Sequence, residues 1–151
     1  MSNKTRTSYS PLVARLARLA TAAHVSLYRL TGGAIGSRAQ HMPVLLLTTT
    51  GRKTGKQHTT PLVYFADGDG FIVVASNGGQ GKLPNWWLNM RQNKQAQIEI
   101  GKKQLRMSVH EADPEEHQRL WPHAVAGFSG YAKYQQRTPY PIPLVILHPM
   151  D

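Results

Sequence analysis

Short apolar segments joined by links too short to hold a helix are the feature that most limits how this chain can fold. Residues 44–50, 59–65 and 71–76 are rich in β-branched and aromatic side chains, and only residues 51–58 and 66–70 separate them. Parallel strands need a crossover of about a dozen residues or more, usually with a helix, so these segments are expected to pair antiparallel through hairpins. The pattern favours a closed or partly closed antiparallel barrel and disfavours a parallel doubly wound sheet.

The remainder of the chain adds further strands and places helices late in the sequence. Asp113-Pro114-Glu115-Glu116 is a capping box with proline at the first helical turn, which marks the start of one helix. The other predicted strands are residues 97–100, 105–111 and 142–147, and the predicted helices are residues 85–93, 114–125 and 131–136. The sequence therefore predicts a mainly β fold with additional α-helices.

An amphipathic helix precedes the strands. Ser10 has the features of an N-cap, Pro11 suits the first helical position, and Gly32 ends the periodic pattern. The pattern predicts a helix of about 20 residues, roughly 30 Å long. Its apolar stripe is formed by Leu12, Leu16, Leu19, Leu27 and Leu30, and Arg15, Arg18 and Arg29 lie on the opposite face. We expect residues 1–39 to form a basic N-terminal segment with this helix and residues 40–151 to form the folded domain.

The surface that the leucine stripe contacts has two interpretations. Arg15 and Arg18 interrupt the apolar run, and no small-residue cleavage site follows it, which argues against a signal peptide or a membrane span. The stripe can pack on the domain's own core, or residues 11–30 can lie on an anionic membrane surface. Both interpretations stay open at this stage.

The positive charge is concentrated in the first half of the chain. The net charge is +10, yet residues 1–66 hold nine Lys or Arg and no acid, whereas the remainder is nearly neutral. This field is expected to attract a phosphate, a polycarboxylate or an anionic membrane. We expect no nucleic-acid partner, because the basic residues are spread out and no DNA- or RNA-binding motif is present.

Several kinds of reactive chemistry are disfavoured by the composition. The chain has no cysteine, which removes disulfides and thiolate chemistry and points to a reducing cytoplasm. The seven histidines lack metal-binding spacing, so no metal site is predicted. No G-x-S-x-G motif or Ser–His–Asp set is evident, and the eight acids fall mostly near turns or caps. This pattern fits a protein whose chemistry comes from a cofactor.

The Gly51-Arg52-Lys53-Thr54-Gly55 turn is a candidate anion site. It superficially resembles a phosphate-binding P-loop, but its glycines are too close, and Gln57 stands where a hydroxyl belongs. An extended segment follows it instead of a helix, so a nucleotide triphosphatase is disfavoured. A glycine-bounded turn with basic side chains and free backbone N–H groups can hold an anion, although a solvated hairpin tip has the same composition.

Three other segments are candidates for the walls of a pocket. Ser76-Asn77-Gly78-Gly79 ends an apolar strand and lets a planar ring or a phosphate approach the backbone closely. The adjacent Trp86 and Trp87 are not expected to face one core, so one is expected in the core and the other is expected to wall a pocket or meet a partner. Phe128, Tyr131 and Tyr134 form one stripe at helical spacing, either facing the core or covering a flat substrate with phenols as hydrogen-bond donors.

Taken in order, these motifs resemble a known family. The segments that carry the resemblance are residues 45–55, 60–65 and 75–79, Trp86 with Asn89, Tyr131 with Tyr134 and Gln135, and residues 142–145. The chain, from about residue 40 to its end, resembles the deazaflavin-dependent nitroreductases of actinobacteria, which use reduced coenzyme F420 and include F420H2-dependent quinone reductases. The resemblance implies a split β-barrel, like the FMN-binding split barrels, preceded by the N-terminal helix.

The resemblance also implies an activity, a cofactor and site residues. The implied activity is hydride transfer from the reduced 8-hydroxy-5-deazaflavin of coenzyme F420 to a quinone such as menaquinone or to a nitro compound. The residues implied on the acceptor side are Ser76, Tyr131 and Tyr134. The residues implied to bind the cofactor are Arg52, Lys53, Thr54, Gly55 and His58 at its tail, and Pro61, Leu62, Ala75, Ser76, Asn77, Gly78, Gly79, Trp86 and Asn89 along its ring and linker.

Three departures and two alternatives accompany this interpretation. Val63 and Phe128 each replace a tyrosine of the nitroimidazole-activating relative, and His58 replaces an arginine of the tail-binding turn. Reduction of nitroimidazoles is therefore in doubt. An FMN-binding split-barrel oxidoreductase and a non-catalytic basic module for cofactor or membrane are the alternatives. Since several members associate with membranes, the expected location is the cytoplasm, at the inner face of the plasma membrane if the helix binds lipid.

Overall fold

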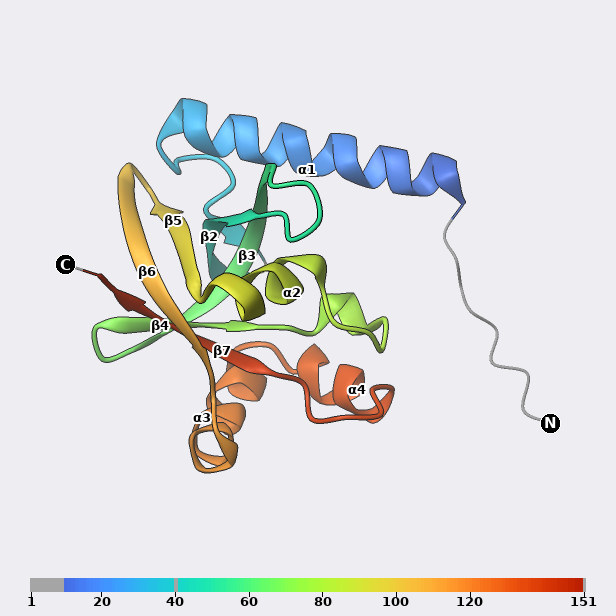
Figure 1. The fold of residues 1–151 in the computed structure, drawn as a ribbon, viewed down its shortest axis with the longest axis vertical. Helices are drawn as coiled ribbons and strands as arrows, with labels where there is room; N and C mark the ends of the chain where they lie inside the picture. Colours follow the sequence, from blue (N-terminus) through green and yellow to red (C-terminus); the bar gives the residue numbers. More distant parts are fainter. Residues whose placement is uncertain (1–9, 40, 151) are drawn as a thin grey trace.

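In the computed structural model, which describes residues 10–39 and 41–150, antiparallel strands close into a barrel (Figure 1). The six strands of this barrel run in the order β2-β3-β4-β7-β6-β5, and β5 pairs again with β2 to complete the ring. They are β2 (Met42–Thr50), β3 (Gln57–Asp67), β4 (Gly70–Val74), β5 (Gln95–Ile100), β6 (Lys103–Glu111) and β7 (Leu144–Pro149). A short strand β1 (Arg38–Ala39) pairs with the start of β2. The predicted antiparallel barrel is confirmed.

Tight hairpins set the register of the barrel. The β3–β4 turn follows the Asp67↔Gly70 pair, and Gly68 within it has φ +61°, a conformation that glycine adopts without strain. Gly70 is itself required by close packing, since a Cβ there would lie 2.8 Å from the carbonyl oxygen of Leu147 on β7. The register of β4 against both neighbours therefore depends on two glycines of one predicted turn.

Three helices and one 3-10 turn complete the domain after the first hairpins. They are η1 (Asn77–Gly79), α2 (Asn85–Asn93), α3 (Pro114–Gly127) and α4 (Gly130–Gln136). The predicted capping box starts α3: the Glu116 amide donates to Asp113 Oδ1 at 2.8 Å, and the Asp113 amide donates to Glu116 Oε1 at 3.1 Å. In Figure 1, α3 and α4 lie together on one side of the barrel, below β4 and β7.

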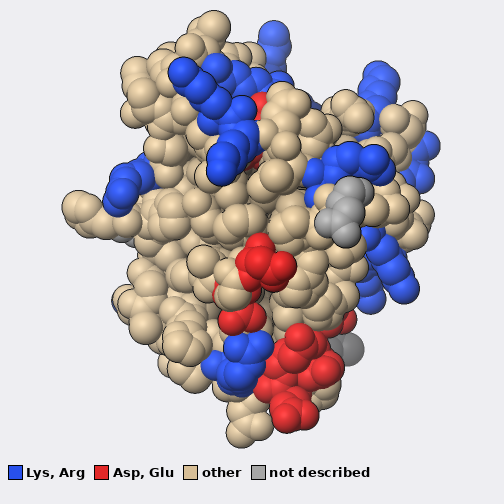
Figure 2. All heavy atoms as spheres, turned by 90° about the vertical axis from the view of Figure 1, so that its left-hand side faces the viewer, with Lys and Arg blue, Asp and Glu red and all other residues tan. Residues whose placement is uncertain are grey.

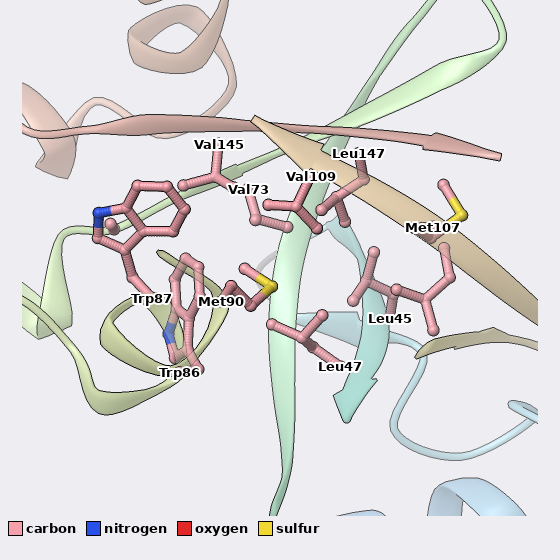
Figure 3. Close-up of a cluster of buried hydrophobic side chains, with 12 residues drawn as sticks. Leu45, Leu47, Val73, Trp86, Trp87, Met90, Met107, Val109, Val145 and Leu147 are labelled. Atoms are coloured by element: carbon pink, nitrogen blue, oxygen red, sulfur yellow. The ribbon is translucent and has the colours of Figure 1, made fainter. Parts of the chain in front are cut away.

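The apolar core has two parts. One cluster fills the barrel and includes Leu45, Leu47 and Val73 (Figure 3), and the other lies between the outer face of β4 and β7 and helices α3 and α4. Trp86 and Trp87 both belong to the first cluster. The prediction that the two would not share one core was wrong, because α2 packs its buried face against the barrel interior (Figure 3). The prediction that one of them would wall a pocket is confirmed, since Trp86 also lines a cavity beside the barrel.

Helix α1 (Pro11–Thr31) lies across the barrel with its leucine stripe turned away from it. Ser10 Oγ accepts a hydrogen bond from the Val13 amide at 3.3 Å, and Gly32 caps the other end with φ +60°. Residues 11–20 are all exposed, and in Figure 1 this half extends beyond the barrel. The exposed fractions of the stripe include 65% for Leu12, 59% for Leu19 and 83% for Leu30. The leucines therefore do not pack on the described part of the core.

Tyr28 joins α1 to the barrel from the face opposite the leucines. Its side chain is 1% exposed, and its Oη accepts a hydrogen bond from the Gly101 amide at 2.8 Å. The same Oη lies 3.2 Å from the carbonyl oxygen of Val44 on β2 and 3.2 Å from that of Glu99 on β5, and the hydroxyl donates its hydrogen bond toward these two acceptors. Beside it, Arg29 Nη2 forms an ion pair with Glu99 Oε2 at 2.8 Å. One phenol therefore connects the helix to both strands that close the barrel.

Replacing Tyr28 with phenylalanine should destabilise the fold while preserving its shape. We expect the free energy of unfolding to fall by about 1–3 kcal/mol, because the partly buried Gly101 amide loses its acceptor. Urea unfolding measures the change. Tyr140→Phe, at a side chain for which the described residues provide no hydrogen bond, is the matched control and should change stability little. Equal stability of Tyr28→Phe and the native chain would contradict the assignment.

Candidate functional site

A cavity of about 540 Å³ opens beside the barrel where β3, η1, α2 and α4 meet. Its volume lies in the range of small-molecule and cofactor sites. Of the residues implied by the family resemblance, eight line it: Pro61, Leu62, Ser76, Asn77, Gly78, Trp86, Tyr131 and Tyr134. Val63 and Phe128, the two positions that depart from the nitroimidazole-activating pattern, line it as well. The structure thus brings together segments far apart in the sequence.

The glycine-containing loop after β4 offers an open backbone at one glycine and a closed one at the next. Gly78 has φ +62°, and a Cβ placed there would have no heavy atom within 4 Å. At Gly79, by contrast, an added Cβ would overlap the Tyr134 ring. Asn77 has φ +49°, a left-handed conformation that Asn tolerates better than most residues. The loop therefore presents Gly78 to a ligand, while Gly79 packs beneath α4.

Ala75 and Asn89 are buried behind the cavity and do not line it. Ala75 is 1% exposed within the barrel cluster, and its amide donates to the Pro143 carbonyl at 2.9 Å. Asn89 is 5% exposed, and its Nδ2 donates to Thr49 Oγ1 at 3.1 Å. Because neither side chain reaches the cavity, both support the site from behind.

The 51–55 turn, defined as Gly51 to Gly55, is closed by its own hydrogen bonds. The Gly51 amide donates to Lys56 O at 2.7 Å, and the Gly55 amide donates to Gly51 O at 2.9 Å. The Lys56 amide donates to Thr54 Oγ1 at 3.3 Å. Only some backbone N–H groups of the turn are therefore free to bind an anion, fewer than the sequence suggested. Anion binding by the turn would depend mainly on the charge of its side chains.

Arg52 is held in place by amides rather than by carboxylates. Its backbone N–H and Nη1 donate to Asn89 Oδ1 at 3.2 and 2.9 Å, and its Nη2 donates to Asn85 Oδ1 at 3.3 Å. No Asp or Glu within residues 10–39 and 41–150 forms an ion pair with it, whereas Arg29 pairs with Glu99. Since neutral partners leave the guanidinium charge uncompensated, Arg52 is a fixed cation beside a cavity-lining residue, Asn85.

His58 and Lys53 complete the turn on its exposed side. The His58 ring lies against Gly51, where an added Cβ would be 3.0 Å from its Nε2. Lys53 and Thr54 are exposed, and neither side chain lines the 540 Å³ cavity. On the face shown in Figure 2, Lys and Arg gather in the upper part, and Asp and Glu gather in the lower part, at the level of α3. The 51–55 turn itself contains Arg52 and Lys53 and no acidic residue, so it is expected to favour negatively charged ligands.

Aromatic rings cover one side of the cavity. Phe128 meets Tyr131 edge to face with ring centroids 4.9 Å apart, and Tyr134 lies 5.9 Å from Phe128 and 6.2 Å from Tyr131. Arg137 lies over the Tyr134 ring at 5.3 Å. Tyr131 also belongs to the second core cluster, so the stripe both faces the core and walls the cavity.

Burial keeps the Tyr131 phenol protonated. Its side chain is 6% exposed, and burial, followed by the nearby Tyr134, raises the pKa of Tyr131 to about 12. Among the described residues, its Oη forms no hydrogen bond. At neutral pH the phenol can therefore donate a hydrogen bond to a ligand but cannot act as a base.

Some lining residues were not anticipated from the sequence. They are Thr60, Val74, Gln80, Pro84 and Asn85. Asn85 had a signal, because it stands four residues before Asn89 on a predicted helix and shares its face. A second cavity of about 730 Å³ shares Asn77, Gln80 and Asn85 and continues to Lys82 and Tyr140, so the hollow extends along the start of α2.

The arrangement suits a flat, anionic ligand. Among the residues that the structure describes, no three His, Cys, Asp or Glu side chains lie close enough to hold a metal ion. No helix in the same part of the chain is long and apolar enough to cross a membrane. The site instead combines an open glycine backbone, aromatic walls and a fixed cation.

Comparison with known proteins identifies relatives that match most of the chain. The model of the F420H(2)-dependent quinone reductase family matches residues 20–149. An F420H(2)-dependent quinone reductase of Mycobacterium tuberculosis (strain ATCC 25618 / H37Rv) is 39% identical over 128 residues, which cover 82% of this chain and 86% of that protein.

Solved structures agree in fold. An F420-H2 dependent reductase, 36% identical, has a TM-score of 0.65 and covers 70% of this chain and 94% of its own. A chain described as a domain-swapped dimer, 31% identical, has a TM-score of 0.67 and covers 92% of this chain and 100% of its own. A pyridoxamine 5'-phosphate oxidase-like protein of Listeria innocua, 15% identical over 72% of this chain and 84% of its own with a TM-score of 0.52, shares the fold alone. The chain therefore belongs to the F420H(2)-dependent quinone reductase family and is an F420-dependent oxidoreductase built on a split β-barrel.

Proposed function

We propose that the 540 Å³ cavity is where this protein brings the deazaflavin of reduced coenzyme F420 against a quinone. The observation that carries the proposal is Arg52, an arginine fixed by Asn85 and Asn89 without a carboxylate partner in the described chain. Because Asn85 also lines the cavity, the cation lies directly beside the space for a ring. A cofactor with a planar ring at one end and phosphate and glutamates at the other needs both features.

The residues present fit such a cofactor. Gly78 leaves room for a ring or linker to approach the backbone, Trp86 adds an aromatic wall, and Leu62 adds an apolar one. The basic 51–55 turn would hold the phosphate and the glutamate tail, with Arg52 rigid and Lys53 exposed. Asn89 acts on the cofactor only through Arg52, and we assign it as a positioning residue.

When bound, the reduced deazaflavin supplies a hydride, and the chain's own residues orient the acceptor and donate to it. Tyr131, protonated at neutral pH, faces the cavity together with Tyr134 and Ser76. Their hydroxyls can donate hydrogen bonds to a quinone oxygen as negative charge develops there. Water can also supply the proton, so none of the three hydroxyls has to be essential.

Quinones are favoured over nitroimidazoles as acceptors. Val63 and Phe128 line the cavity and present no hydroxyl to an acceptor. Flat apolar walls suit a quinone ring. A nitro group would meet two fewer hydroxyl donors here than in the nitroimidazole-activating relative, because Val63 and Phe128 replace its two tyrosines. We therefore propose quinone reduction as the main activity, with slow or absent reduction of nitroimidazoles.

We also propose that residues 1–39 are a membrane-docking segment attached to a catalytic domain of residues 40–151. The leucine stripe of α1 is exposed. Residues 1–66 contain basic residues and no acidic ones. A cytoplasmic anionic leaflet offers both an apolar interior and negative charge, and it also dissolves quinones with long side chains. A peripheral position at the inner face of the plasma membrane follows.

The cofactor assignment predicts a defined response to a neutral substitution of Arg52. Arg52→Gln should weaken F420 binding by about tenfold to a hundredfold, because a charge-assisted contact is lost. The loss should be larger for long glutamate tails than for short ones. Fluorescence titration of the purified chain with F420, with FMN titrated in parallel, and decay of F420H2 absorbance with a naphthoquinone measure binding and turnover.

Arg106→Gln, at an exposed arginine of β6, is the matched control and should leave affinity unchanged. Tight FMN binding with no response to F420 would overturn the cofactor assignment in favour of the FMN alternative. A saturated complex that oxidises no quinone would favour the non-catalytic module.

The membrane proposal predicts that the leucine stripe determines binding to vesicles. Replacing Leu12, Leu16 and Leu19 together with glutamine should reduce sedimentation with anionic vesicles by about tenfold or more, since each buried leucine contributes about 1.5–3 kcal/mol. The control replaces Ala14, Ala17 and Ala22 with glutamine. These three residues are exposed and lie on other faces of α1 than the leucines. Equal binding of both triple variants, or a leucine-dependent dimer without vesicle binding, would contradict the proposal.

The Tyr131 environment predicts a loss of stability at high pH. The folded-state pKa is about 12 and the unfolded value about 10, so the folded state retains its proton longer. That contribution is present below pH 10 and is lost as pH rises from about 10 to 12, by about 2–3 kcal/mol. Urea unfolding across this range should show a shallower decline in Tyr131→Phe than in the native chain. Parallel declines would show that the phenol is not buried as described.

A further inference from the structure

A proline-rich segment links the two elements that carry the acceptor-side hydroxyls. This segment, residues 138–143, has the sequence Thr-Pro-Tyr-Pro-Ile-Pro and connects α4 to β7. Proline lacks a backbone N–H, so a run with proline at every second position cannot pair as a strand along its length. Between Pro139 and Pro143 only Tyr140 and Ile142 keep an N–H. The position of the proline-rich segment therefore depends on packing and on the side chains that bond to it.

Gln135 of α4 forms two hydrogen bonds with the proline-rich segment. Its Nε2 donates to the carbonyl oxygen of Tyr140, and its Oε1 accepts from the Ile142 amide, each at 2.8 Å. The Gln135 side chain is half-buried, and Ile142 is 1% exposed. Because one amide group uses both a donor and its acceptor on the same segment, it fixes how α4 lies against that segment.

Helix α4 needs such contacts more than a longer helix would. It has seven residues, whereas an isolated helix needs roughly 12–15 residues to be even marginally stable. The side chain of its N-cap, Ser129, forms no capping hydrogen bond. Tyr131, Tyr134 and Gln135 are spaced three and four residues apart along α4, so they share one face of it. The hydrogen bonds of Gln135 therefore hold the same face that carries the two phenols.

The other end of the proline-rich segment is bonded next to Ser76. The Ala75 amide donates to the carbonyl oxygen of Pro143 at 2.9 Å, and Ser76 follows Ala75 directly. The phenols of α4 and the Ser76 hydroxyl come from separate elements, yet the same six-residue segment is hydrogen-bonded beside both. Gln135 is thus one end of a chain of contacts that crosses the acceptor side of the cavity.

We infer that Gln135 is a positioning residue that sets the placement of the two α4 phenols relative to Ser76. The inference rests on the proposed function, because that function gives these hydroxyls an acceptor to bind. Gln135 does not line the 540 Å³ cavity, so it acts only through its neighbours. A displacement of about 1 Å in a reacting group can lower a rate by about a hundredfold, so small movements of α4 are expected to matter.

The test removes the donor of Gln135 and keeps its acceptor. In Gln135→Glu, one carboxylate oxygen can still accept from the Ile142 amide, but the other faces the Tyr140 carbonyl oxygen without a proton. We expect kcat/KM for a naphthoquinone to fall by about fivefold or more at pH 8 in the chain saturated with F420H2. The Kd for F420, measured by fluorescence titration, should change by less than about twofold, because Arg52 is held by α2 instead.

Lowering the pH should rescue this variant. A protonated glutamic acid has an O–H donor and a carbonyl acceptor, as the native amide has both functions. Burial beside a carbonyl oxygen favours the protonated form, so the pKa of the new carboxyl is expected above its ordinary value of about 4.3. The ratio of variant to native kcat/KM should therefore rise as the pH falls from about 8 to about 5.

Other titratable and charged groups near Gln135 are present in both chains, so the ratio removes their contribution. His117 of α3 has its Nε2 2.9 Å from the Ile142 carbonyl oxygen, and Arg137 lies over the Tyr134 ring. Burial raises the pKa of Tyr140, which keeps that phenol protonated throughout the range. A recovery confined to Gln135→Glu therefore reports the new carboxyl.

Two further variants complete the comparison. Gln135→Leu removes the donor and the acceptor together, so it should show a loss at pH 8 with no recovery at pH 5. Gln136→Glu, at the exposed next residue of α4, changes the net charge equally and is the matched control. It should keep kcat/KM within about twofold of the native value at every pH, because an exposed charge contributes little.

The outcomes separate this inference from the proposed function. Native-like kcat/KM of Gln135→Glu at pH 8, or a loss without recovery at pH 5, overturns the positioning role and leaves quinone reduction standing. An equal loss in Gln136→Glu, or an equal loss of F420 affinity, shows a general disturbance and also overturns the positioning role. Failure of the native chain to reduce any quinone overturns the proposed function and this inference with it.

Discussion

The pairing of β2 with β5 is the constraint on which the rest of the structure depends. It joins Leu46, Leu47 and Thr48 to Glu99, Ile98 and Gln97, and it converts an open sheet into a barrel with a filled interior. The Tyr28 hydroxyl lies between carbonyl oxygens of the same two strands, at Val44 and Glu99. Closure of the barrel and attachment of α1 therefore both depend on the β2–β5 pair.

Barrel closure also places the two ends of the proposed cofactor site. The 51–55 turn is the tip of the β2–β3 hairpin, and α2 packs its tryptophans against the interior that this closure creates. Asn89 then spans the two elements, because it donates to Thr49 on β2 and accepts from Arg52 in the turn. An exposed basic hairpin tip thereby gains a fixed arginine. Without α2 the same turn would be the solvated loop that its composition also allows.

The strands and most helices were predictable because their signals are local. The hairpin between Asp67 and Gly70, the capping box at Asp113 and the β-branched segments each depend on residues a few positions apart. The direction of the α1 leucines was not predictable, because an amphipathic pattern does not say which surface the helix meets. Tyr28, on the face opposite the leucines, carries the attachment instead.

The site was predictable only as a set of separate motifs. The family resemblance gave Pro61, Leu62, Ser76 and Tyr131, which meet in one cavity. Their assignment as cofactor and acceptor residues stays a prediction. The sequence did not identify Thr60 or Gln80 as lining residues, although Thr60 lies in a segment that carries the resemblance. Their place on the cavity wall depends on how β3 passes the loop after β4. The hydrogen bonds of Arg52 to two amides likewise depend on long-range packing that spacing does not encode.

If the cavity is the reaction site, we expect positioning, rather than acid–base catalysis, to control the reaction. Burial raises the pKa of Tyr131 to about 12, so this phenol keeps its proton well beyond the physiological range, within which an ordinary tyrosine is also protonated. A hydride needs its donor carbon and its acceptor at close range and in fixed orientation, and it needs water kept out. Rings at Phe128, Tyr131 and Tyr134 form one wall of the cavity, and in the proposed complex Arg52 would hold the distant anionic end of the cofactor. Selectivity among acceptors is then expected to depend on the shape of the cavity, to which Val63 and Phe128 contribute side chains without a hydroxyl.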